Sequence, residues 1–263
     1  MENMVVNQLT QHITVITDRL GVNLTLVTGS EKALLIDTGY GLDPLLPVIK
    51  ELTDLPVQII LTHAHHDHAL GAMQFEQVRA FPEEGPVYET YSCRERRLKV
   101  LRNAGLSPEQ YEQYLDRPMP TLCTLAEGSM DLGGLCVNIM KVPGHTPGSA
   151  MILVPEDGVL ISGDNWNPET WLFFPEALPL HIYKRNMQKV LELPFESVIC
   201  SHRQGLFPRA RLERFTAGIR ASAPWQLSPF ADLPEIRCAR MPLDGDQVIA
   251  FDADKCDFGQ LDT

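Results

Sequence analysis

Short runs of apolar, mostly β-branched residues recur along the first half of the chain, and each run is bounded by turn residues. This pattern predicts strands, and the segment between the last two has the spacing of a helix. The expected strands are 12–17, 22–27, 33–39 and 57–61, and the expected helix is 42–52. The last of these strands runs directly into a cluster of histidines.

The second half of the chain repeats part of this arrangement. Strands are expected over 135–142, 150–154, 159–162 and 197–200, with a helix over 182–193. In both halves an apolar strand ends in an acidic or glycine turn, and the next strand ends in a hydroxyl residue followed by histidine, Thr62-His63 or Ser201-His202. We interpret this as a weak internal duplication.

Two further segments complete the predicted organisation. Residues 91–117 look helical and carry a local excess of positive charge, for which a solvated helix face is the default interpretation. After a helix over 208–221 the chain becomes proline-rich, and Asp-Gly at 244–245 predicts a hairpin of strands 236–241 and 247–253. We therefore expect one domain over 1–221 with a helical insertion at about 91–117, and a C-terminal extension over 222–263 packed on the same domain.

Composition narrows the class of protein. Apolar residues make up 44% and charged residues 21% of the 263 residues, as in a soluble globular protein. No basic leader precedes an apolar stretch, and no apolar run reaches the roughly 20 residues that cross a bilayer, so we expect a cytoplasmic protein with no membrane partner. The six cysteines form no CxxC pair, which favours reduced thiols without a nucleophilic role. The net charge of −12 argues against nucleic acid as a partner.

Four histidines and an aspartate lie within six residues at the end of the strand 57–61. In His63-Ala64-His65-His66-Asp67-His68, strand alternation places His63 and His65 on one side, and Asp67 and His68 begin the turn into a helix. Imidazole and carboxylate bind zinc, iron or manganese. Burying so many ionisable groups without a metal would cost several kcal/mol, so a metal site is predicted. His66 falls in the opposite position and is expected to face outward.

Three later segments place a polar residue where a strand ends, which is where sites assemble in sheets with helices on their outer faces. They are Gly144-His145-Thr146-Pro147-Gly148-Ser149, Gly163-Asp164 and Ser201-His202. With the histidine cluster, and in this order, they resemble the metallo-β-lactamase superfamily of metal-dependent hydrolases over residues 9–221. The resemblance implies an α/β fold, the four-layered αβ/βα sandwich of two similar halves.

The resemblance also implies a ligand set for two divalent metal ions, most simply zinc, with iron or manganese as alternatives. One ion would be held by His63, His65 and His145. The other would be held by Asp67, His68 and His202, and Asp164 would bridge both. Asp37, in the family's Asp-Thr-Gly position, would orient ligands without binding metal itself. The true β-lactamases of the superfamily have cysteine where Asp164 stands, so the chain looks more like the glyoxalase II, lactonase and thioesterase branches.

A mechanism follows from this ligand set. Two cations lower the pKa of a bridging water, so that a metal-held hydroxide attacks a carbonyl carbon near neutral pH. Asp67 can orient that hydroxide or take up a proton, which makes it the candidate catalytic residue.

The substrate is expected to be a small molecule with an ester-type bond, most simply a thioester. An aromatic, proline-flanked stretch after Asp164 reads as a loop that could form an apolar wall for an acyl chain, with core packing as the alternative; its residues are Trp166, Trp171, Phe173 and Phe174. Arg203 opens a second basic stretch, which together with residues 91–117 could receive an anionic substrate end.

Other functions stay open at this point. A lactone or a small phosphodiester would suit the same ligand set. A di-iron redox protein would need a separate flavin partner, because no flavodoxin-like domain follows in the sequence. A metal-bound scaffold without turnover is the non-enzymatic alternative. No feature of the sequence sets an oligomeric state.

Overall fold

The computed structural model describes residues 3–262, so positions 1, 2 and 263 of the predicted domain limits lie outside it. The chain divides into two compact units, Met1–Ile139 and Met140–Thr263. Residues 222–263 therefore share a unit with the chain from Met140 onward. Among the described helices, none is long and apolar enough to cross a membrane.

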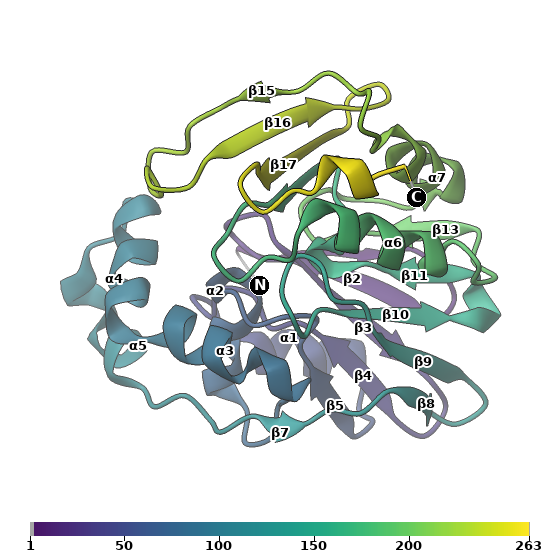
Figure 1. The fold of residues 1–263 in the computed structure, drawn as a ribbon. Helices are drawn as coiled ribbons and strands as arrows, with labels where there is room; N and C mark the ends of the chain where they lie inside the picture. The colour runs from purple at the N-terminus through teal and green to yellow at the C-terminus, as the bar shows by residue number, and fades with distance from the viewer. Residues whose placement is uncertain (1–2, 263) are drawn as a thin grey trace. The chain divides into compact units, whose positions relative to one another are not determined.

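The first unit is built on a seven-stranded sheet (Figure 1). Pairing is antiparallel from β1 to β4 and parallel from β4 to β7. In spatial order the strands are β1 (Val5–Gln8), β2 (Ile13–Thr17), β3 (Asn23–Thr28), β4 (Ala33–Ile36), β5 (Val57–Ile60), β6 (Arg79–Ala80) and β7 (Cys123–Thr124). The four predicted strands of this half are confirmed. The sequence did not predict β1, β6 and β7, because two are only two residues long and β1 is a largely exposed edge strand.

Helix α1 (Leu45–Leu52) covers part of this sheet. Its buried residues Leu45, Val48 and Ile49 have the spacing of one helix face, and they belong to the same core cluster as Leu24 and Leu35 of the sheet. A hairpin of β8 (Gly128–Asp131) and β9 (Cys136–Lys141) follows, and β9 leads into the second unit.

The predicted helical segment is confirmed but is interrupted. Within 91–117 lie α4 (Arg94–Asn103) and α5 (Glu112–Asp116). Helix α3 (Gly85–Ser92) starts before the predicted segment and ends before Cys93, whose backbone is extended. The Arg97 side chain is buried and donates hydrogen bonds to the carbonyls of Ser92, Tyr114 and Leu115, at 2.9 to 3.1 Å. A buried guanidinium needs such partners. Arg97 therefore ties α4 to α5 and does not serve an anionic substrate.

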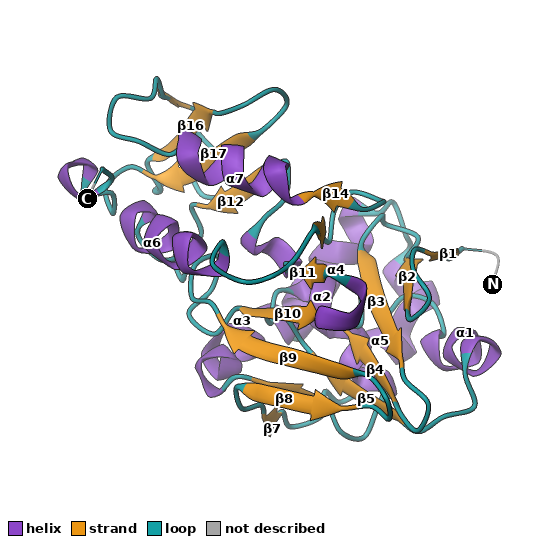
Figure 2. Ribbon diagram, turned by 90° about the vertical axis from the view of Figure 1, so that its right-hand side faces the viewer, coloured by secondary structure: helices purple, strands orange, loops and turns teal. Residues whose placement is uncertain are grey.

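The second unit contains three of the four predicted strands of the second half, and the fourth is β9, which crosses the boundary between the units (Figure 2). Strand β10 (Ala150–Val154) pairs antiparallel with β11 (Val159–Ile161), β11 pairs parallel with β13 (Ser197–Ile199), and β13 pairs with the short β14 (Phe207–Pro208). The helices are α6 (Leu180–Val190) and α7 (Arg209–Gly218), close to their predicted limits.

A second sheet in this unit joins the C-terminal extension to the aromatic stretch that follows Asp164. Its order is β12-β17-β16-β15, with β12 (Glu169–Leu172), β15 (Gln226–Leu227), β16 (Cys238–Pro242) and β17 (Val248–Asp252). Figure 1 labels β15, β16 and β17, and Figure 2 labels β12. The predicted hairpin is β16 and β17. The prediction that the aromatic stretch is a loop is wrong for Glu169–Leu172, because that segment pairs in parallel with β17.

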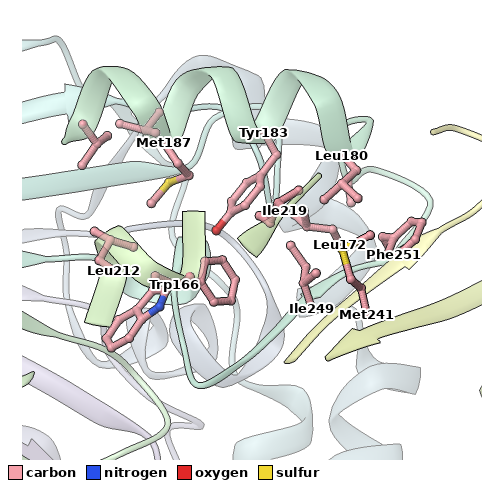
Figure 3. Close-up of a cluster of buried hydrophobic side chains, with 14 of the residues drawn as sticks. Trp166, Leu172, Leu180, Tyr183, Met187, Leu212, Ile219, Met241, Ile249 and Phe251 are labelled. Carbon is pink, nitrogen blue, oxygen red and sulfur yellow. The ribbon is translucent and has the colours of Figure 1, made fainter. Parts of the chain in front are cut away.

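One face of this sheet packs into the main core of the second unit. Figure 3 shows Leu172, Ile249 and Phe251 of the sheet together with Leu180 and Tyr183 of α6. Trp166 is fully buried in the same cluster, and its indole N–H donates to Gln247 Oε1 at 3.3 Å. Phe173 is also buried. These two aromatic residues are therefore core residues, which leaves Trp171 and Phe174 of the four substrate candidates.

The acids of the C-terminal extension neutralise much of the basic stretch on α7. Arg211 pairs with Asp246, and Arg214 pairs with Asp244. Arg209 pairs with Glu213 and also donates to main-chain carbonyls of the loop before β13. Exposed pairs of this kind contribute about 0–1 kcal/mol each. Of the arginines after the last histidine, these three are held by intramolecular partners and are poor candidates for substrate binding.

Candidate metal centre

The first unit gathers four of the predicted ligands on the segment after β5. Strand β5 ends at Ile60, residues 61–65 form a bent connection, and the short helix α2 (His66–Ala69) begins directly after it. The ring centroid of His63 lies 4.8 Å from that of His65 and 4.0 Å from that of His68. Asp67 Oδ2 lies 3.5 Å from His68 Nε2. These side chains therefore lie close together, although the strand itself has ended at Ile60 and the predicted strand alternation does not extend to His63 and His65.

Asp37 orients residues of this group by the hydrogen bonds of its carboxylate. It follows β4 and is 2% exposed. Its carboxylate accepts hydrogen bonds from the Thr62 amide at 2.7 Å, from the Thr62 hydroxyl at 2.8 Å and from His68 Nδ1 at 2.8 Å. Its φ of 66° is the one positive value at a non-glycine among the described residues, and a backbone in that region is strained for most side chains.

The Asp37 contacts fix which ring nitrogen of two histidines carries the proton. A carboxylate only accepts, so His68 donates through Nδ1. The single hydroxyl hydrogen of Thr62 goes to Asp37, so Thr62 Oγ1 accepts from His63 Nδ1, which lies 3.1 Å away. In both neutral rings Nε2 then carries the lone pair, which is the form that binds a metal.

The loop after Asp37 holds α2 by close backbone packing. The amide and the hydroxyl of Thr38 both donate to the His68 carbonyl at 2.8 Å, and the Gly71 amide donates to the Gly39 carbonyl at 3.0 Å. A Cβ on Gly71 would lie 2.0 Å from the Thr38 carbonyl oxygen. Glycine at 71 is therefore required for the loop that carries Asp37 to approach the helix that carries His68.

We expect Gly71→Ala to lower the free energy of unfolding by about 3 kcal/mol, because the contacting atom is backbone and cannot move aside cheaply. Gly85→Ala is the control, since a Cβ there meets nothing within 4 Å. Urea unfolding of both variants measures the difference. Equal midpoints would show that the approach of Gly71 to Thr38 is not tight.

The second unit gathers the other three predicted ligands around one carboxylate. Asp164 Oδ2 lies 3.0 Å from His202 Nε2 and 3.8 Å from His145 Nε2. His145 follows β9, Asp164 follows β11, and His202 follows β13, so all three stand just beyond strand ends. His145 is buried, Asp164 is partly buried and His202 is exposed.

Two asparagines that the sequence analysis did not single out support these ligands. Asn165 Oδ1 accepts from the His145 amide at 3.0 Å, and Asn165 Nδ2 donates to the Val142 carbonyl at 2.6 Å. Asn167 Oδ1 accepts from the His202 amide at 3.1 Å, while its Nδ2 donates to Asp164 Oδ1 at 3.1 Å. The run Asp164-Asn165-Trp166-Asn167 is visible in the sequence. The role of the two asparagine side chains cannot be read from it, because their partners follow other strands.

The ring of His145 is oriented by a main-chain carbonyl. Its Nδ1 donates to the Trp171 carbonyl at 2.6 Å, so Nε2 carries the lone pair and points toward Asp164. Strand β12 thus reaches the site through its backbone, and a ligand of the second unit depends on how that strand is placed.

The prediction that His66 faces outward is wrong. Its ring packs edge-on to Tyr40 and stacks on Tyr91 of α3, with centroids 5.6 and 5.9 Å apart, and burial lowers its pKa. The same Tyr91 ring lies 4.5 Å from that of His65. The fully buried Glu84 accepts from the Ala64 amide at 2.7 Å. Glu84 and Tyr91 therefore contact the histidine segment 63–68 and help to hold it, a role that no sequence motif indicated.

Burial also changes the pKa of Cys200, which among the described residues is the buried thiol close to a ligand of the second unit. Cys200 lies two positions before His202, and desolvation raises its pKa to about 12. A thiol of that kind stays protonated at neutral pH and is a poor nucleophile.

Comparison with known proteins identifies the family. The model of the metallo-beta-lactamase superfamily matches residues 17–202, which includes all seven predicted ligands. The chain therefore belongs to the metallo-beta-lactamase superfamily, and its α/β fold is that of the family, as predicted.

Curated relatives of this chain include two thioester hydrolases. The acyl-coenzyme A thioesterase MBLAC2 of Homo sapiens is 28% identical over 160 residues, which cover 54% of this chain and 57% of that protein. The hydroxyacylglutathione hydrolase GloC of Haemophilus influenzae is 31% identical over 149 residues, which cover 54% of this chain and 65% of that protein. The chain thus spans a little over half the length of these relatives.

Solved structures agree on the fold. TTHA1623 in a di-iron-bound form is 28% identical with a TM-score of 0.54, covering 70% of this chain and 88% of that one. The DIM-1 metallo-beta-lactamase is 16% identical with a TM-score of 0.57, covering 80% of this chain and 94% of that one, a likeness that concerns the fold alone.

Proposed function

We propose that this protein is a dinuclear metal-dependent hydrolase of thioesters. The observation that carries the proposal is the donor set: five histidines and two aspartates follow strand ends, and three of the rings are held with Nδ1 protonated, so that Nε2 carries the lone pair that a metal would bind. Imidazole and carboxylate together favour zinc or iron over magnesium or calcium. Family membership supports a metal-dependent hydrolase in general.

In this proposal the two groups of ligands hold two divalent ions. His63, His65 and His145 hold one, Asp67, His68 and His202 hold the other, and Asp164 serves both. Zinc is our first expectation, and iron is the alternative that the di-iron form of TTHA1623 supports. Two ions bound by these residues would supply hydroxide from water at neutral pH and would polarise a carbonyl group.

The chain's own residues then set the geometry and the proton inventory of the reaction. Asp37 holds the His68 ring directly and the His63 ring through Thr62, which keeps both in the binding tautomer. Asp67 takes up or orients the proton of the attacking water. Hydrolysis adds that water across the thioester: the carbonyl carbon gains the oxygen, the carbon–sulfur bond breaks, and an acid and a thiol are released.

The substrate class rests on two kinds of support. The relatives MBLAC2 and GloC both act on thioesters by their names. In the second unit, the exposed Trp171 and the partly buried Phe174 stand beside His145, with the Phe174 ring centroid 6.0 Å from that of His145. We infer an acyl-coenzyme A substrate whose acyl part meets these rings and whose anionic part meets Arg203, which adjoins the ligand His202.

A hydrolysis panel tests the proposal. Purified protein is assayed on acyl-coenzyme A, hydroxyacylglutathione, lactone, β-lactam and phosphodiester substrates, before and after metal removal with a chelator. We expect the highest kcat/KM on a thioester, and a loss of at least about a hundredfold after chelation. Oxygen or flavin reduction without any hydrolysis would favour the di-iron redox alternative and overturn the proposal. Full turnover of neutral lactones with none of any thioester would overturn the substrate class.

A further inference from the structure

We propose that Phe230, in the C-terminal extension, is a specificity-determining residue that selects thioesters with long acyl chains. This inference rests on the proposed function and goes beyond it by assigning the acyl site to a segment that lies outside the family model, which ends at residue 202. The residue comes from the segment between β15 and β16, which the sequence analysis read only as a proline-rich connection.

Strand β12 is paired with a strand of the C-terminal extension. This strand lies inside the family domain in sequence, yet its hydrogen-bonding partner is β17 of the extension, with Glu169 opposite Val248 and Leu172 opposite Phe251. Its side chains alternate, with Thr170 and Leu172 buried and with Glu169 and Trp171 exposed. The extension therefore holds the strand whose backbone carbonyl orients His145 and whose Trp171 side chain stands on the outer face.

An apolar cluster lies on the outer face of β12, the face that carries Trp171. Phe173, Cys238 and Ala250 form a small core cluster, and Phe230 with its neighbours Leu233 and Ile236 packs against it. The Phe230 ring centroid lies 5.6 Å from that of Trp171 and 4.8 Å from that of Phe173. Phe174 lies 6.1 Å from Trp171 and 6.0 Å from His145. An unbroken row of aromatic rings thus leads from a metal ligand to the extension.

Hydrogen bonds from charged side chains hold this apolar surface in place. Glu169 accepts from the Trp171 indole N–H at 3.1 Å and from Arg240 at 2.6 Å, and the Arg240 contact lowers the pKa of Glu169. Lys255 donates to the carbonyls of Phe174, Pro175 and Ala177 at 2.6 to 3.2 Å, which fixes the turn after Phe174. A rigid apolar surface that is partly exposed suits an acyl chain, because each buried methylene contributes about 0.8 kcal/mol.

The test compares kcat/KM for palmitoyl-, octanoyl- and acetyl-coenzyme A in the wild type and in Phe230→Ala. We expect the ratio of palmitoyl to acetyl activity to fall about tenfold in the variant, mainly through KM, and to recover partly in Phe230→Leu. Trp225→Ala is the matched control: Trp225 is 36% exposed, as Trp171 is, but it stacks on Phe258 and packs edge-on to Phe251 instead of contacting the Phe230 cluster. That control should keep the wild-type ratio.

A binding measurement separates failure of this inference from failure of the proposed function. The non-hydrolysable thioether S-hexadecyl-coenzyme A is titrated into each protein, and isothermal titration calorimetry measures its binding. Weaker binding to Phe230→Ala supports the acyl surface even if no thioester is hydrolysed. An unchanged chain-length ratio and unchanged thioether binding, or an equal loss on all three substrates, would overturn it.

Discussion

Replacing Asp164 with alanine is expected to lower kcat/KM on the preferred thioester at least about a thousandfold and to reduce the metal content of the purified protein. The reason is its position: one carboxylate oxygen lies 3.0 Å from His202 Nε2 and 3.8 Å from His145 Nε2, so this group is common to both histidines. No neighbouring side chain in the run 163–167 offers a second carboxylate. Metal content is measured by elemental analysis of the same sample used for kinetics.

Asp164→Asn and Asp254→Ala are the controls for that experiment. Asparagine keeps the shape and the contact with Asn167 but loses the charge, so we expect it to behave like alanine if the charge binds metal. Asp254 is an exposed acid of the same unit, and its removal should change neither activity nor metal content. Full activity with two ions bound in Asp164→Ala would remove Asp164 from the site.

Asp37→Ala is expected to weaken metal binding by about 10- to 100-fold and to cost about 1–3 kcal/mol of stability. The substitution leaves the Thr62 amide, the Thr62 hydroxyl and the His68 ring without their shared acceptor in a buried place. It also puts alanine at a φ of 66°, which alanine adopts poorly. Competition with a chelator measures the metal affinity, and thermal unfolding measures the stability.

Asp37→Asn separates the two effects of that substitution. Asparagine tolerates the left-handed region and can still accept from the Thr62 amide, but its NH₂ group cannot accept from His68. We therefore expect Asp37→Asn to recover only part of the stability lost in Asp37→Ala, through the backbone conformation and the Thr62 amide contact, with metal affinity as low as in Asp37→Ala. If Asp37→Asn binds metal as tightly as the wild type, the backbone conformation and not the carboxylate is what matters at this position.

Many residues of the candidate site were predictable because they lie close together in the sequence or directly after short apolar strands. His63, His65 and His68 lie within six residues, and the bent connection after β5 and the start of α2 bring their rings close together, although the strand ends at Ile60. The second-unit ligands each follow a strand that was itself predictable from a short apolar run. Asp37 was expected to orient ligands, and its contacts with Thr62 and His68 now show how it does so.

What the sequence could not indicate depends on partners far away along the chain. Glu169–Leu172 became a strand only because β17 lies beside it, and nothing local to residues 169–172 announces that pairing. Trp166 and Trp171 looked equivalent in sequence, yet one is fully buried and the other is 36% exposed. The arginines of α7 looked free to bind an anion, but Asp244 and Asp246 are their partners. Glu84 and Tyr91 carried no motif at all.

Metal titration tests the central claim most directly. Metal-free protein receives zinc in steps while hydrolysis of palmitoyl-coenzyme A is followed, and bound metal is measured in parallel. We predict that the rate rises with added zinc and reaches its plateau at two ions per chain, with little turnover at the start. Thioester hydrolysis at full rate in the metal-free protein, or two bound ions without any hydrolysis, would contradict a dinuclear metal-dependent thioesterase.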